Sequence, residues 1–215
     1  MGVEHPSKKA SIRDSRRTRD NILKAALKEF ADKGLAGARV DLVAEQAGIN
    51  KRMLYYYFGG KDDLYRAVLE KVYSEMRDAE AALDLQGLTP MKAIERIVEF
   101  KFDYPLKHPY LIKLLAGENM LKAVNLKRLK SLQSENQKII DRLEGLLLAG
   151  QADGSIRDGI DPLHLYVTIS AVSYFYFSNT PSLSVTFGRD LKARSELADR
   201  RAHAIDVIAR FLATG

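Results

Sequence analysis

One short run of the chain, residues 50–61, holds the side chains best suited to chemistry: NKRMLYYYFGGK. Lys51 and Arg52 can donate hydrogen bonds to N7 and O6 of guanine in the major groove of DNA. Met53 and Tyr55 can contact thymine methyl groups, and tyrosine hydroxyls can donate to phosphate oxygens. Cations followed by aromatics therefore indicate a contact with nucleic acid.

The four consecutive aromatics of this run cannot all belong to a protein core. Successive helical residues are about 100° apart, so four of them cover most of the helix circumference. Leu54 and Phe58 fit the core face, whereas Tyr55 and Tyr56 point away from it with the two cations. Some of these aromatic side chains must therefore be exposed.

A helix-turn-helix would position these residues. We expect a first amphipathic helix over residues 14–33 that stops at Gly34, and a short second helix that ends at Gly48. Gly48 fits the turn because glycine adopts backbone conformations that are costly for other residues. Asn50 can cap the third helix, which ends near Phe58. A helix, an Ala-Gly turn and a second short helix with cations are typical of this motif.

The remainder of the chain also has helical periodicity and no convincing two-residue alternation, so we expect an all-α fold of about nine helices. Proline is tolerated at the first position of a helix, so three X-Pro pairs, at residues 89–90, 108–109 and 161–162, predict helix starts. The expected helices after the motif cover residues 61–85, 122–149, 162–179 and 190–213, in addition to those that start at Pro90 and Pro109.

Composition excludes several classes of protein. The chain has 215 residues and no cysteine, so it has no disulfide framework and no thiolate metal site. No segment reads as a secretory signal or as a membrane span, and we expect a cytoplasmic protein. The four histidines are scattered, and no nucleophile elbow, zinc motif or complete phosphate loop occurs. We therefore expect no catalytic site, no metal and no cofactor.

The positive charge is concentrated in the N-terminal third. Residues 1–66 hold 14 Lys and Arg against 9 Asp and Glu, whereas the rest of the chain holds 20 against 19. Such a patch suggests a polyanion partner, although charge alone is equally compatible with a solvated tail. The same two readings apply to a basic N-terminal arm, which would contact phosphates or the minor groove if it binds DNA. Its cations are Lys8, Lys9, Arg13, Arg16, Arg17 and Arg19.

The segment VAEQAGINKRMLYYYFGGKDDLYRAVL resembles the DNA-binding signature of TetR-type (TetR/AcrR) transcriptional regulators. That signature reads approximately I-A-x-x-A-G-V-S-x-x-x-L-Y-x-H-F-x-x-K-x-x-L, and ten positions between Val43 and Leu64 fall on it without a gap. The preceding ILKAALKEFADKGLAG is similar to the first helix of that family. Two departures are that no hydroxyl residue precedes the second helix, which follows Ala38 and Arg39, and that Tyr57 replaces the usual histidine.

The resemblance implies two domains with different functions. Residues 1–60 would form the DNA-binding domain with its basic arm, and residues 61–215 would bind an effector and form the dimer. Base contacts are implied for Lys51, Arg52, Met53 and Tyr55, and phosphate contacts for Arg39, Tyr56, Tyr57 and Lys61. Asn50, which stands where the family more often has serine, is also counted among the DNA-binding residues.

The C-terminal region carries a second aromatic run, YFYF at residues 174–177, which sweeps about 300° of a helix. One explanation is that the helix faces two apolar environments, such as a pocket on one side and a subunit interface on the other. The other explanation is that the helix is buried on all sides within one subunit. This region also resembles, faintly, that of TetR-type repressors of pyrimidine or nicotinate breakdown. Polar groups stranded in apolar helices are the candidate effector ligands, and they are His108, Glu118, Asn119, Tyr174 and Asn179.

The leading interpretation is a homodimeric, sequence-specific regulator, most simply a repressor that a small aromatic or carboxylate-bearing effector releases from a near-palindromic double-stranded operator. One alternative is an architectural protein that binds DNA without sequence preference, which would leave the large second region without a task. Another is an enzyme that acts on a small metabolite, for which the sequence offers no motif.

Overall fold

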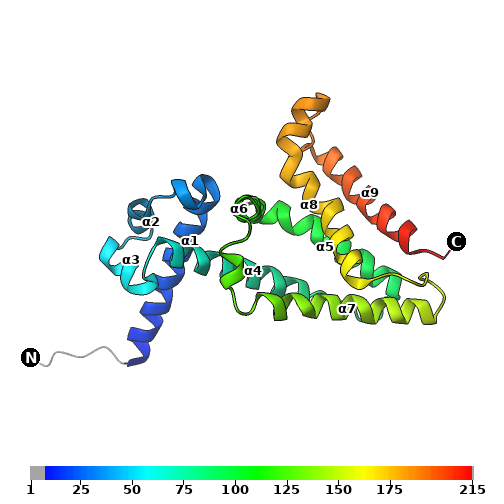
Figure 1. The fold of residues 1–215 in the computed structure, drawn as a ribbon, viewed down its shortest axis with the longest axis horizontal. Helices are drawn as coiled ribbons and strands as arrows, with labels where there is room; N and C mark the ends of the chain where they lie inside the picture. Colours follow the sequence, from blue (N-terminus) through cyan, green and yellow to red (C-terminus); the bar gives the residue numbers. More distant parts are fainter. Residues whose placement is uncertain (1–7, 215) are drawn as a thin grey trace, which may run out of the picture. The chain divides into compact units, whose positions relative to one another are not determined.

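The computed structural model describes residues 8–214, with side chains from residue 14 onward (Figure 1). Within this range the chain forms nine α-helices, one 3-10 turn and no strand, so the prediction of an all-α fold is confirmed. The chain divides into two compact units. Unit 1 comprises the residues up to 72 together with 113–129, and unit 2 comprises residues 73–112 and those from 130 onward.

Unit 1 is built from the first helices of the chain: α1 (Lys8–Gly37), α2 (Val40–Gln46), α3 (Lys51–Phe58) and the first part of α4 (Lys61–Ala81). It also includes the end of α6 (Pro109–Met120) and the 3-10 turn η1 (Leu126–Arg128). Phe30 and Tyr65, both buried, meet edge to face with their ring centroids 5.0 Å apart. The kink at Gly34, which has a φ of 66°, falls where the sequence predicts the end of the first helix.

Unit 2 is organised around α5 (Pro90–Lys107), which packs against α7 (Leu132–Ala152), α8 (Pro162–Phe187) and α9 (Arg194–Leu212) (Figure 1). The buried side of α5 carries Ile94, Ile97, Val98 and Phe102, at the three- and four-residue spacing of one helix face. Capping fixes two helix starts as predicted, because Thr89 accepts from the N–H of Lys92 and Asp161 from that of His164. No helix in the described part of the chain is long and apolar enough to cross a membrane.

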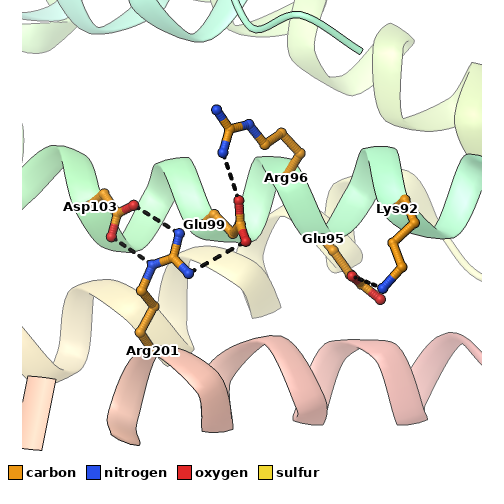
Figure 2. Close-up of polar contacts among 6 residues, drawn as sticks. All are labelled: Lys92, Glu95, Arg96, Glu99, Asp103 and Arg201. Carbon is orange, nitrogen blue, oxygen red and sulfur yellow. Dashed lines mark hydrogen bonds and ion pairs between the residues drawn. The ribbon is translucent and has the colours of Figure 1, made fainter. Parts of the chain in front are cut away.

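A polar bridge joins α9 to α5 at the surface of unit 2 (Figure 2). Arg201 donates from Nε and Nη2 to the two carboxylate oxygens of Asp103, at 2.9 Å and 3.0 Å, and lies 3.4 Å from Glu99. Two-point pairing of this kind fixes the orientation of both side chains, and the hydrogen bond to Asp103 is the main reason why the pKa of Arg201 is raised.

The helix predicted over residues 122–149 starts only at Leu132. Before it lies a turn segment in which Lys122 and Ala123 have positive φ angles. The physical reason is Glu118, a fully buried carboxylate that accepts hydrogen bonds from the backbone N–H groups of Asn125 and Leu126 and from the Asn125 side chain. Because these N–H groups already have an acceptor, they do not need the hydrogen bonds that a helix would provide.

Other helix limits also differ from the expectation, and α9 begins at Arg194 and not at residue 190. The first helix already begins at Lys8, α4 ends at Ala81, and α8 continues to Phe187. Pro181 lies inside α8, where the sequence suggests a stop, and it removes one backbone donor without ending the helix.

Candidate nucleic-acid interface

The turn between α2 and α3 has the predicted geometry. Gly48 has a φ of 68°, and the N–H of Ile49 donates to the carbonyl of Ala44 at 3.0 Å. Asn50 caps α3, because its Oδ1 accepts from the N–H of Met53 at 2.9 Å. The hydrogen bond across the turn and the cap together hold the start of α3 in one orientation.

The faces of α3 separate as expected from the helical spacing. Leu54 is completely buried and Phe58 is 8% exposed, whereas Tyr56 is 85% exposed. Met53 and Tyr55 are about half as exposed as Tyr56, and Lys51 and Arg52 also lie on the surface. The outer face of α3 therefore presents two cations, a methionine and two tyrosines without a covering element in unit 1.

Lys51 has a partner within unit 1 that the sequence did not suggest. Its Nζ lies 2.8 Å from Oδ1 of Asp41 on α2. The hydrogen bond in this pair raises the pKa of Lys51 and lowers the pKa of Asp41. Both side chains are about half exposed, so water screens the pair and Lys51 can exchange it for a ligand at small cost.

Tyr57, which stands where the family has histidine, is half-buried and bonded to α1. Its hydroxyl donates to Oγ of Ser15 at 3.3 Å. Arg19, four residues further along α1, lies over the ring of Phe58 at 5.1 Å. Arg19 thus belongs to the same surface as the end of α3. Arg16 and Arg17 are also exposed on α1, while the side chains of Lys8, Lys9 and Arg13 lie outside the described residues.

Arg39 precedes α2 and Lys61 follows α3, and each makes a hydrogen bond that involves a backbone group of unit 1. The N–H of Arg39 donates to the buried carboxylate of Glu29 on α1 at 3.0 Å, which fixes the start of α2 where no hydroxyl residue is present. Its guanidinium side chain is exposed. Lys61 donates from Nζ to the carbonyl of Ala36 at 3.0 Å, so a phosphate would have to compete with that carbonyl.

The candidate effector residues are divided between the two units. Glu118 and Asn119 belong to unit 1, where Glu118 is occupied by the turn that it holds and Asn119 is exposed. His108, Tyr174 and Asn179 belong to unit 2.

The three candidates in unit 2 already have partners. Nδ1 of His108 lies 2.6 Å from the Tyr110 hydroxyl, Tyr174 donates weakly to the carbonyl of Ile112, and Asn179 donates to the carbonyl of Phe175 in its own helix. Their role as effector ligands stays a prediction.

The sequence reading missed a buried group of charges in unit 2 that includes Lys101. It stands seven residues after Ile94 and four after Ile97, on the core face of α5, and is itself buried. A cation on an otherwise apolar helix face was the available signal.

A helix-turn-helix that presents cations and aromatics on its second helix, followed by a larger helical unit, defines the class of DNA-binding transcription regulators. Comparison with known proteins gives the family. Residues 22–68 match the family described as bacterial regulatory proteins, tetR family, and residues 90–208 match the tetracyclin repressor-like C-terminal domain. The chain belongs to the TetR family of transcriptional regulators.

Individual relatives agree with this assignment. The chain is 38% identical over 196 residues to the HTH-type transcriptional repressor NicS of Pseudomonas putida, covering 91% of this chain and 92% of that protein. It is 29% identical over 171 residues to the HTH-type transcriptional regulator RutR of Escherichia coli K12, covering 80% of this chain and 79% of RutR. A crystal structure of a TetR family regulator from Marinobacter aquaeolei has the same fold, with a TM-score of 0.68 at 20% identity over 94% of this chain and 99% of that one.

These matches confirm the family predicted from residues 43–69, and the protein is a DNA-binding transcription regulator and not an enzyme. The similarity to NicS and RutR also agrees with the resemblance of the C-terminal region to repressors of nicotinate or pyrimidine breakdown.

Proposed function

We propose that this protein is a homodimeric repressor that binds a near-palindromic double-stranded operator and leaves it when a small effector binds. The observation that carries the proposal is the outer face of α3, where Lys51, Arg52, Met53 and Tyr55 are exposed side by side on a helix capped by Asn50. Because its target is the bacterial chromosome, the protein acts in the cytoplasm.

The proposed contacts fall into two groups. Lys51 and Arg52 read guanines, while Met53 and Tyr55 contact thymine methyl groups. Tyr56, Tyr57, Arg39 and Lys61 hold phosphates, as do the exposed cations of α1. Phosphate contacts set the position of the protein, and base contacts set its sequence preference.

An exposed apolar face on α8 supports the homodimer. Leu163, Val167 and Phe175 are each more than half exposed, and their spacing of four and eight residues places them on one side of the helix. Apolar side chains gathered in this way on a surface are typical of an interaction site. A second copy of the chain, related by a two-fold axis, would cover this face and would present two α3 helices to two half-sites.

The test is fluorescence anisotropy with the DNA upstream of the protein's own gene, over a series of salt concentrations. We expect specific binding that weakens steeply with salt and that survives competition with random DNA. If random DNA competes as well as the upstream fragment itself, the protein is an architectural DNA-binding protein. If no salt-dependent binding is found, the proposal is wrong. Sedimentation of the free protein should give the mass of a dimer.

A further inference from the structure

Unit 1 buries a carboxylate on the core face of its first helix. Glu29 lies on α1, seven positions after Ile22 and three after Ala26, so it shares their face of the helix. Ile22 and Ala26 are completely buried, and Glu29 is only 7% exposed. A glutamate is rarely buried unless hydrogen bonds or opposite charges compensate for the lost water. What Glu29 contacts must therefore explain why it stands in the core.

Glu29 contacts the backbone at the start of α2. Its Oε1 accepts from the N–H of Arg39 at 3.0 Å. Arg39 is the residue that begins α2, because its carbonyl accepts the first hydrogen bond of that helix, from the N–H of Val43 at 3.2 Å. The N–H of such a residue has no partner within its own helix. Glu29 supplies the partner from another helix, ten positions earlier in the chain.

The described residues of α2 do not supply this acceptor themselves. Arg39 makes no capping hydrogen bond with its side chain. In a capping box, the third residue of the helix is Glu or Gln, and its side chain accepts from the N–H of the cap residue. In α2 the third residue is Leu42, which has no acceptor. The start of α2 thus depends on a carboxylate of α1, whereas α3 is capped by its own Asn50.

An acceptor on another helix also fixes a direction. Val43 and Ala44 are buried and hold α2 against the core, but apolar contacts are not directional. The hydrogen bond from Arg39 to Glu29 joins α2 to α1 at one point with a defined geometry. The direction of α2 is passed on to α3, because the N–H of Ile49 in the turn between them donates to the carbonyl of Ala44.

We propose that Glu29 is a positioning residue for DNA recognition, which sets the direction of α2 and α3 relative to α1 through the N–H of Arg39. The inference rests on the proposed reading of an operator by α3. Because Glu29 is buried, it acts on DNA only through the helices that it joins. Without this bond, only a fraction of the protomers holds α3 in the binding orientation. A dimer needs both α3 helices, so that fraction enters the operator affinity twice.

The first test measures operator binding of full-length variants by fluorescence anisotropy, with the DNA upstream of the protein's own gene as the probe. Glu29→Gln keeps an accepting oxygen at the same reach, and we expect its affinity to stay within about threefold of the wild type. Glu29→Met has a side chain of similar length without that acceptor, and we expect a loss of roughly tenfold or more.

The matched control for this test is Glu45→Met, which removes the same charge from the exposed surface of α2 and should bind as the wild type does. If Glu29→Met binds as tightly as the control, the proposal is wrong. If Glu29→Met folds poorly, Glu29→Asp takes its place, because it keeps the charge but is too short by one methylene to reach Arg39.

A second substitution separates positioning from simple capping. Leu42→Gln places an acceptor at the third residue of α2, where it can form a capping box with Arg39. Added to Glu29→Met, it should restore the melting temperature without restoring operator affinity, because the new cap does not join α2 to α1. Leu42→Gln alone is the baseline. If the double variant regains affinity together with the melting temperature, Glu29 is only a cap and the proposal is wrong.

The direction of α2 is also measured in the free protein. The chain has no cysteine, so nitroxide labels at Lys28→Cys on α1 and Gln46→Cys on α2, both exposed positions, attach only there. With labelled protein diluted in unlabelled protein, pulsed electron paramagnetic resonance should give a narrow distance distribution for the wild type and Glu29→Gln. We expect a clearly broader one for Glu29→Met, with or without Leu42→Gln. Equal widths in all of them would contradict the proposal.

The label distances keep this proposal apart from the proposed repressor. A wild type that binds no upstream DNA contradicts the repressor, while the distances in the free protein still decide the role of Glu29. A wild type that binds its operator, with a Glu29→Met variant equal to it in affinity and in label distances, leaves the repressor standing and removes only the role of Glu29.

Discussion

Lys51 in α3 and Lys101 in α5 each pair with a carboxylate at almost the same N···O distance, 2.8 Å to Asp41 and 2.7 Å to Glu80. Their surroundings differ. The side chains of the first pair are 49% and 57% exposed, whereas those of the second are 9% and 3% exposed. Water and salt screen the first pair, but the second cannot open without leaving a charge in the core. Distance alone therefore does not reveal what an ion pair does.

The same contrast separates the two units. Unit 1 carries its cations on the outer surface of α1 and α3, where a polyanion can reach them and where each existing contact is easily exchanged. Unit 2 holds Arg77 and Lys101 inside, where both are paired with the buried carboxylate of Glu80 and no polyanion can reach them. The location of positive charge thus fits the surface of unit 1, and not the interior of unit 2, to a contact with nucleic acid.

The largest expected effect comes from truncating the carboxylate of the buried pair, with the same truncation in the exposed pair as the comparison. Glu80→Ala leaves Lys101 and Arg77 buried without a counter-charge, and we expect it to lower the free energy of unfolding by about 3–5 kcal/mol. Asp41→Ala should hardly change the urea unfolding midpoint, because its lysine remains hydrated. Similar midpoints for the two variants in urea unfolding would refute the contrast.

A smaller effect should come from the caps of the two units. Asn50→Ala removes the cap of α3 and Asp161→Ala removes that of α8, each at a cost of about 1 kcal/mol in unfolding free energy. We expect only Asn50→Ala to weaken operator binding in a gel-shift titration, because only α3 presents base-reading side chains. An equal loss of operator affinity in both variants would mean that general stability, and not the orientation of α3, limits binding.

The smallest effect should appear when the competitor of Lys51 is removed. Asp41→Asn frees Lys51 for DNA, and we expect operator affinity to rise by a factor on the order of a few. The matched control is Glu45→Gln, which removes the same charge from the exposed surface of α2. If anisotropy shows the same gain for both, long-range charge and not the release of Lys51 explains the change.

The features of unit 1 that the sequence predicted are local ones. The cap at Asn50, the glycine turn at Gly48 and the buried pair Leu54 and Phe58 each depend on residues within a few positions of one another. Capping and helical spacing are rules of short range, so the helix-turn-helix could be read directly.

The features that were missed depend on partners far apart in the chain. Glu80 meets Lys101 across 21 positions, and Arg77 meets Tyr166 across 89. Tyr57 is bonded to Ser15, which lies 42 positions away. The prediction of a helix from residue 122 was wrong for a related reason. The leucine spacing suggested an apolar helix face, but the N–H groups of Asn125 and Leu126 donate to the buried carboxylate of Glu118.

The central claim, that α3 reads the sequence of an operator, is tested most directly through Arg52. Competition anisotropy would compare wild type and Arg52→Ala on the operator and on variants of it that each carry one changed base pair. We predict that the wild type loses about 1–3 kcal/mol at one base pair, and that Arg52→Ala binds the operator and that variant equally well. Uniform weakening by Arg52→Ala on every sequence, with the preference at each base pair intact, would contradict the claim and make Arg52 a phosphate contact.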